Sequence, residues 1–152
     1  MGFILYVGII LGIFAGDYWI KNHVEKNGRE GETREMLGGR LLLRKHHNRG
    51  AALNFGEGKR PLIAAVSVVM TLLTLVLFLF SLGQKGNGLL RTGLSLLLGG
   101  AFSNTYDRLK RTYVVDYVSF GVKWKGLKNI VFNCSDFCII IGALLTALGA
   151  GR

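Results

Sequence analysis

The chain is poor in acidic residues, cysteine and proline, and each scarcity narrows the possibilities. Of its 152 residues, nine are Asp or Glu, two are Cys and one is Pro, against 19 Lys or Arg. Cys134 and Cys138 are too few for a disulfide framework or a structural zinc site, and we expect them to be small buried side chains. No HExxH pattern supports a zinc peptidase. We therefore expect neither a metal nor a cofactor.

Uncharged apolar segments dominate the remaining sequence. Residues 62–82 are 21 residues without a charge, and a helix needs about 20 to cross a bilayer. Three other segments are similar in kind, and the first has no basic region or cleavage pattern typical of a secretion signal. The chain is therefore predicted to be an all-α membrane protein. We expect one domain, 1–152, with a four-transmembrane-helix bundle whose spans are about 2–20, 61–82, 89–107 and 130–150.

The net charge of +10 comes mainly from two polar loops. Ten of the 19 basic residues fall in 21–60 and six in 108–128. Such a surface is compatible with nucleic-acid binding, but in a four-span protein loops lying against anionic headgroups are the better explanation. We expect contact with membrane lipid and no nucleic acid.

Local patterns inside these segments give three further predictions. Residues 40–45 (RLLLRK) are predicted to form a short strand, and residues 112–124 have the β-branched and aromatic content of an extended segment. Gly8, Gly12 and Gly16 form a small-residue face suited to close helix contact. We expect this face to pack inside the protein's own bundle, and the protein to be a monomer.

The connectivity of four spans places the polar residues on one side of the membrane. The ends of spans one and three, both long loops and the start of span four must share one face. That face receives all four aspartates and most of the polar residues near the membrane. These residues are Asp17, Lys21, Asn48, Asn104, Asp107, Arg108, Asp116, Asn133 and Asp136.

Helical spacing suggests how these groups pair. Asp17 and Lys21 are four residues apart, which suits an ion pair. Asp116 and Asp136 have apolar neighbours and no local cation. Two carboxylates held close together share a proton, an arrangement that suits peptide hydrolysis by water. Alternatively, Asp116 pairs within the basic loop and Asp136 caps the last helix; spacing alone leaves both possibilities open.

Five short motifs occur in a specific order along nearly the whole chain. They are GDYWIK (16–21), NRGAAL (48–53), GGAFSNTYDR (99–108), VVDY (114–117) and FNCSD (132–136). Each is weak alone, but together with the four-span layout they are specific. The set resembles signal peptidase II, the bacterial lipoprotein signal peptidase.

The resemblance implies an aspartyl endopeptidase of the bacterial cytoplasmic membrane, with its active site towards the outer face. Its substrates would be prolipoproteins, cleaved before a diacylglyceryl-modified cysteine. The catalytic pair would be Asp116 and Asp136, and Asp107 would be a structural partner of basic residues. The matching site-shaping residues are Asp17, Lys21, Asn48, Gly50, Asn104, Arg108 and Asn133. The family fold adds a small extracytoplasmic β-cradle, formed by the loops, and a surface helix.

The sequence departs from the family pattern in four places. Ser103 replaces a glycine, Leu53 a phenylalanine and Ser135 an alanine, and a proline is absent from 129–131. We expect Ser135 to donate a hydrogen bond to the neighbouring Asp136. The departures leave a second hypothesis, a non-catalytic relative that binds lipidated peptides or modulates a membrane partner. An ion pathway ranks last, because the acids cluster at one face. The basic loops also oppose the family orientation under the positive-inside rule.

Overall fold

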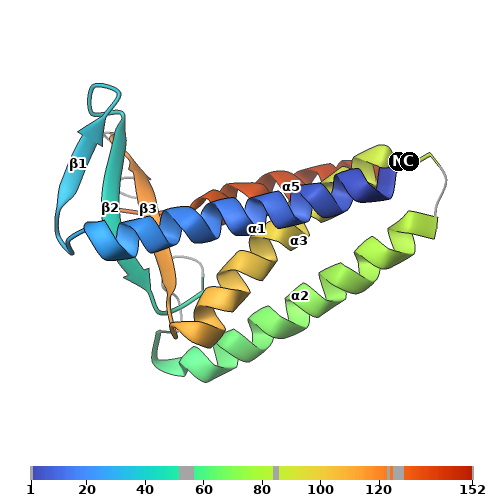
Figure 1. Cartoon of the computed structure of the whole chain (residues 1–152), viewed down its shortest axis with the longest axis horizontal. Helices are drawn as coiled ribbons and strands as arrows, with labels where there is room; N and C mark the ends of the chain where they lie inside the picture. Colours follow the sequence, from blue (N-terminus) through green and yellow to red (C-terminus); the bar gives the residue numbers. More distant parts are fainter. Residues whose placement is uncertain (1, 52–56, 84–85, 123, 125–128, 152) are drawn as a thin grey trace.

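Four long α-helices and a three-stranded sheet make up the described part of the computed structural model (Figure 1). It describes residues 2–51, 57–83, 86–122, 124 and 129–151. The elements in chain order are α1 (Gly2–Asn27), β1 (Thr33–Met36), β2 (Leu41–Asn48), the short 3-10 helix η2 (Glu57–Lys59), α2 (Arg60–Gly83), α3 (Gly88–Lys110), β3 (Val114–Phe120) and α5 (Cys134–Ala150).

The helices lie at the four predicted places, with two boundaries displaced. α1 continues to Asn27 instead of ending near residue 20, and α5 begins at Cys134 because Asn133 caps it. Within the described residues, α1 and α2 are long and apolar enough to cross a membrane, whereas α5 is a shorter apolar helix of 17 residues. The fold is thus mostly helical with a small antiparallel sheet, and four spans stay a prediction.

α3 is the central helix, with α1, α2 and α5 packed around it (Figure 1). Its contact with α5 is close because glycines face the opposite backbone. A Cβ on Gly93 would lie 2.5 Å from Thr146 N, and one on Gly142 would lie 2.5 Å from Leu97 N. The prediction that the glycine face of α1 packs closely against another helix is wrong. A Cβ on Gly8, Gly12 or Gly16 would meet nothing within 4 Å.

The sheet has the order β1-β2-β3, with both pairs antiparallel. Both predicted extended segments are confirmed as β2 and β3, whereas β1 was not predicted. On its free edge, β3 meets Phe132, which exchanges backbone hydrogen bonds of 2.6 and 2.8 Å with Val118. Because Phe132 directly precedes Asn133, this contact places the N-terminal cap of α5 next to the sheet.

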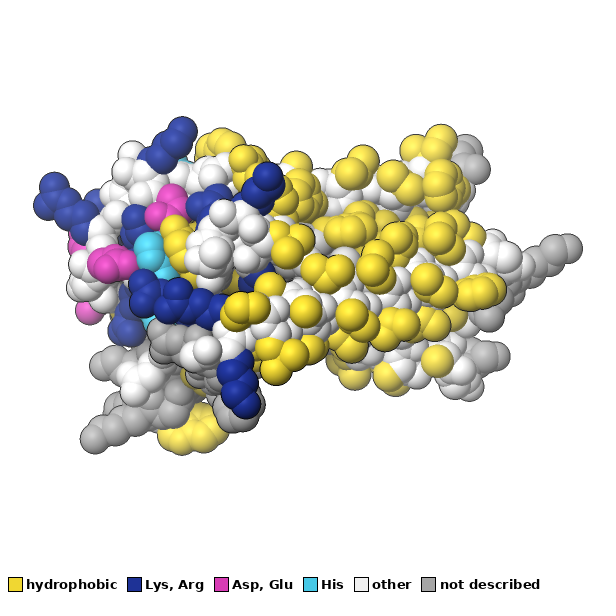
Figure 2. All heavy atoms as spheres, turned by 90° about the horizontal axis from the view of Figure 1, so that it is seen from below, with side chains coloured by type: hydrophobic (Ala, Val, Ile, Leu, Met, Phe, Trp, Pro, Cys, Tyr) yellow, Lys and Arg dark blue, Asp and Glu magenta, His cyan; other side chains and the backbone are white. Residues whose placement is uncertain are grey.

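The sheet covers one end of the helices, and both chain termini lie at the other (Figure 1). The end of α1, the end of α3 and the start of α5 all reach the sheet. Figure 2 shows Lys and Arg gathered over the sheet end and hydrophobic side chains covering the helices. The polar residues therefore meet at one end of the fold, as the connectivity predicts.

Candidate active site

Asp116 of β3 and Asp136 of α5 line the same cavity, which has a volume of about 480 Å³. Its polar end also receives Asn48, Asn104 and Arg108. The rest of the wall is largely apolar and comes from α2, α3, α5 and the segment before α5. The main apolar contributors are Val66, Met70, Leu97, Ile130, Val131, Phe132, Ile139 and Ile140.

Local structure brings the two aspartates together although 20 residues separate them. The Phe132 bridge to β3 places Asn133 beside Asp116, and Asn133 is the N-cap of α5. The Asn133 side chain accepts from Asp136 N, and the Asp136 carboxylate accepts from Asn133 N, both at 2.9 Å. This reciprocal capping box fixes the Asp136 carboxylate relative to the helix start. One of the alternatives from the sequence, Asp136 as a cap, is therefore correct, and it leaves the carboxylate in the cavity wall.

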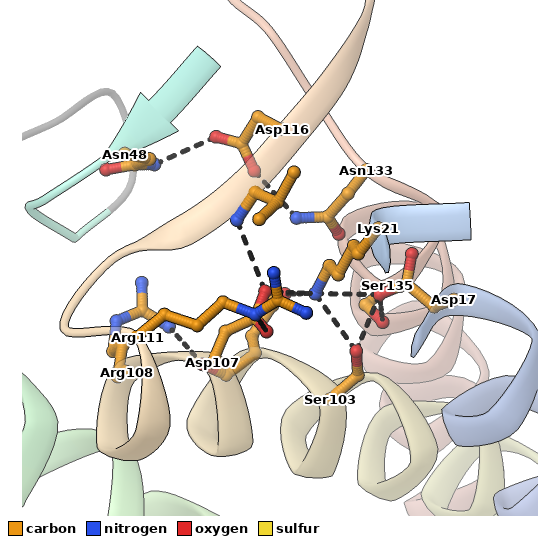
Figure 3. A network of polar contacts seen from close by, with 12 residues as sticks. Asp17, Lys21, Asn48, Ser103, Asp107, Arg108, Arg111, Asp116, Asn133 and Ser135 are labelled. Carbon is orange, nitrogen blue, oxygen red and sulfur yellow. Dashed lines mark hydrogen bonds and ion pairs between the residues drawn. The ribbon is translucent and has the colours of Figure 1, made fainter. Parts of the chain in front are cut away.

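Three asparagine side chains donate hydrogen bonds to the aspartates. Asn133 Nδ2 donates to Asp116 Oδ1 at 2.7 Å and Asn48 Nδ2 to Asp116 Oδ2 at 3.1 Å (Figure 3). Asn104 Nδ2 donates to Asp136 Oδ1 at 2.9 Å. Asn48 pairs with Val114 across the sheet, so its side chain shares a face with Asp116. The amides orient both carboxylates without adding charge.

Asp116 is 2% exposed. Burial, followed by the negative charge of Asp136, raises the pKa of Asp116 to about 7, although the amides of Asn48 and Asn133 favour its ionised form. A carboxyl group with this pKa holds a proton for much of the time at neutral pH. The pair can therefore present one acid and one base together.

The loop after β2 is held against the end of α3. The backbone N–H of Gly50 donates to Asn48 Oδ1 at 3.1 Å, and Arg108 Nη2 donates to Gly50 O at 3.2 Å. Arg108 Nη1 also donates to Asn104 O at 3.3 Å. Arg108 thus links the Asn48 loop to the helix that carries Asn104, and its own side chain lines the cavity.

Asp17 and Lys21 lie behind the cavity wall in a buried ionic network. Lys21 Nζ is 2.8 Å from Asp17 Oδ2 and 3.2 Å from Asp107 Oδ2, which confirms the ion pair expected from spacing. Asp107 also binds Arg111 Nε at 3.0 Å and accepts from Val115 N (Figure 3). Asp107 is therefore a structural partner of basic residues, as predicted.

Several predictions about single side chains are wrong. Ser135 Oγ donates to Asp17 Oδ2 at 2.5 Å and not to Asp136. Cys134 is exposed and Cys138 half-buried instead of fully buried. Leu53, one of the departures from the family pattern, lies outside the described residues.

Sequence reasoning missed Tyr117, whose hydroxyl donates to Asp17 Oδ1 at 2.8 Å and accepts from Cys134 N at 2.9 Å. Period-two alternation in β3 could have revealed it, because it places Tyr117 on the face opposite Asp116.

The sequence matches a known protein family over most of its length. The family model described as signal peptidase (SPase) II matches residues 9–150. The chain belongs to the signal peptidase II family. A lipoprotein signal peptidase of Caldicellulosiruptor bescii is 35% identical over 142 residues, covering 93% of this chain and 87% of that protein. One from Lactobacillus johnsonii is 31% identical over 141 residues, covering 93% and 88%.

Solved structures agree on the fold. A bacterial membrane enzyme determined by the in meso method at 1.9 Å resolution superposes with a TM-score of 0.80 at 22% identity. The match covers 96% of this chain and 92% of that one. The chain therefore shares this fold, and its membership of the signal peptidase II family indicates a membrane protein.

Proposed function

We propose that this protein is an intramembrane aspartyl endopeptidase that removes signal peptides from prolipoproteins before a diacylglyceryl-modified cysteine. Family membership and relatives named lipoprotein signal peptidase support the activity. The observation that carries the assignment of residues is the cavity, because it combines two adjacent carboxylates with a mainly apolar wall. Such a wall suits the lipid-bearing end of a substrate, while the carboxylates face its peptide.

In the proposed reaction, Asp136 removes a proton from a water molecule held between the two carboxylates. The resulting hydroxide attacks the carbonyl carbon of the scissile peptide bond, and protonated Asp116 donates a hydrogen bond to the carbonyl oxygen. The tetrahedral intermediate collapses when the leaving nitrogen takes the proton held by Asp136. The products are a carboxylic acid and an amine, and the carboxyl pair returns to its starting state with one proton.

The length of α5 supports a site close to one membrane interface. α5 has 17 residues, or roughly 25 Å at 1.5 Å per residue, against a hydrocarbon core of about 30 Å. If α5 spans with its C-terminal end at one interface, its N-terminal end lies just below the other. We propose four spans in the bacterial cytoplasmic membrane, with Asp116 and Asp136 near the outer face. The acyl chains of a substrate could then remain in lipid.

Cleavage of a lipid-modified prolipoprotein by the purified protein tests this function. Asp116→Asn and Asp136→Asn should each lower the cleavage rate by roughly 10²–10⁴-fold, the usual contribution of a general acid or base. Asparagine has nearly the same size as aspartate and keeps one acceptor oxygen. In Asp136→Asn, the capping hydrogen bond from Asn133 N should therefore survive. Insensitivity to chelators is expected, because two carboxylates and a water suffice for the reaction.

A matched control is Glu32→Gln, which removes a carboxylate at an exposed position in the sheet region. It should cleave at the wild-type rate. Wild-type cleavage by either aspartate variant would refute the catalytic roles. Lipopeptide binding without turnover by the unaltered protein would support the non-catalytic alternative.

A further inference from the structure

Two serines from different helices converge on one carboxylate oxygen. Ser103 Oγ of α3 donates to Asp17 Oδ2 at 2.6 Å, and Ser135 Oγ of α5 donates to the same oxygen at 2.5 Å (Figure 3). Both serines are at most 2% exposed. They are also the two positions where the sequence replaces the glycine and the alanine of the family pattern. Two departures that are 32 residues apart in sequence therefore belong to one contact.

The Asp17 carboxylate has little remaining freedom. Its Oδ2 atom also lies 2.8 Å from Lys21 Nζ, and its Oδ1 atom accepts from Tyr117 at 2.8 Å. A carboxylate offers about four acceptor positions, two on each oxygen. Three of the donors share Oδ2 and one holds Oδ1, so both oxygens are fixed in place. Asp17 thereby joins α1, α3, α5 and β3 at a single buried point.

A chain of hydrogen bonds leads from this point to the proposed catalytic pair. Lys21 Nζ donates to Ser103 Oγ at 3.0 Å and to Asn104 Oδ1 at 2.9 Å. The Lys21 ammonium group donates to the oxygen of the Asn104 amide. The amide nitrogen of Asn104 is therefore directed to Asp136 and donates to Asp136 Oδ1 at 2.9 Å. The position of Lys21 thus decides which atom of Asn104 faces Asp136.

We propose that Ser103 and Ser135 are paired positioning residues, which hold Asp17 and Lys21 so that Asn104 orients the Asp136 carboxylate. This inference rests on the proposed function. The serines act at a distance, since neither lines the cavity, whereas Asn104 and Asp136 do. Their loss should therefore change the rate of the chemical step without changing the surface that binds substrate.

The experiment compares the wild type with Ser103→Ala, Ser135→Ala and the double variant, by kcat and KM for a lipid-modified prolipoprotein. Each single variant should lose roughly tenfold in kcat, in line with small misplacements of a catalytic group, with KM unchanged. The double variant should lose less than the product of the two single effects, because residues that act as a unit are not additive. Ser95→Ala is the matched control: Ser95 is a buried serine of α3 whose hydroxyl donates to Arg91 O within the same helix, and kcat should stay unchanged.

Thermal unfolding of each variant in detergent separates positioning from packing. A lower Tm with kcat and KM unaltered at a temperature where all variants are folded would overturn the inference, as would a rise in KM alone. Equal cleavage by the wild type and the double variant would overturn it and leave the proposed function standing. Absence of cleavage by the wild type would overturn both.

Discussion

The buried ammonium group of Lys21 should be the most sensitive point for stability. Its Nζ lies between the carboxylates of Asp17 and Asp107, and the three side chains are at most 1% exposed. Arg111 adds a second cation beside Asp107, so two positive and two negative formal charges cancel. Lys21→Met leaves this group with a net charge of −1. Removing one partner of a buried ion pair costs about 3–5 kcal/mol, because the other charge stays buried without compensation.

This loss is large enough to measure as a shift in the melting temperature. For chains of about this length, 1 kcal/mol shifts Tm by roughly 2–4 °C, so Lys21→Met should lower Tm by roughly 6–20 °C. Tryptophan fluorescence during heating in detergent micelles would measure it. Lys26→Met is the matched control, since Lys26 lies exposed in the last turn of the same helix, and it should change stability by less than about 0.5 kcal/mol.

A double variant tests whether charge balance is the cause. Asp17→Asn combined with Lys21→Met removes one charge of each sign and leaves the neutral pair of Asp107 and Arg111. It should therefore be less destabilised than the sum of the two single variants. An additive result, or an unchanged Tm for Lys21→Met, would refute the argument that an unpaired buried charge dominates.

Three other measurements address pH, packing and orientation. The pKa of Asp116 is raised to about 7, and this carboxyl must be protonated to act as the acid. The value of kcat should therefore fall above pH 7 as Asp116 loses its proton, approaching tenfold per pH unit. A rate still rising at pH 9 would contradict this. Gly93→Ala should destabilise the α3–α5 contact by roughly 1–3 kcal/mol in thermal unfolding, whereas Gly12→Ala, where a Cβ meets open space, should be neutral or stabilising. In a protein without its native cysteines, E30C should react with an impermeant thiol reagent from outside and G86C should not; the reverse pattern would invert the proposed orientation.

The parts of the site that the sequence predicts are those governed by simple periodicity. Four spans return the chain to the same side after every second helix, so the grouping of the aspartates at one end needs only a count of apolar segments. The Asp17–Lys21 pair needs only the i,i+4 rule. The pairing of Asp116 with Asp136 could not be derived from spacing, because it depends on the Phe132 bridge to β3, a tertiary contact made by one residue.

The errors also have physical reasons. Ser135 was expected to bond to Asp136 because the two are adjacent in sequence, but adjacent residues on a helix do not face each other. Ser135 instead points across to α1. β1 was missed because its four residues are all exposed and carry no alternating pattern. The spacing of Gly8, Gly12 and Gly16 is the same whether or not another helix lies against these residues. Only the packing of the folded chain could therefore show whether this face makes a close helix contact.

The network behind the cavity explains how a lysine can lie so near the proposed catalytic pair without disabling it. A cation in direct contact with the pair would favour ionisation of both carboxylates and remove the shared proton on which the proposed mechanism depends. Asp17 and Asp107 flank the ammonium of Lys21, and its positive charge changes the pKa of Asp116 less than burial, Asp136 and the amides of Asn48 and Asn133 do. The direct contact with Asp136 is an amide hydrogen bond from Asn104, which is directional and uncharged. Lys21 can thus orient the pair through Asn104 while the two carboxylates keep one proton between them.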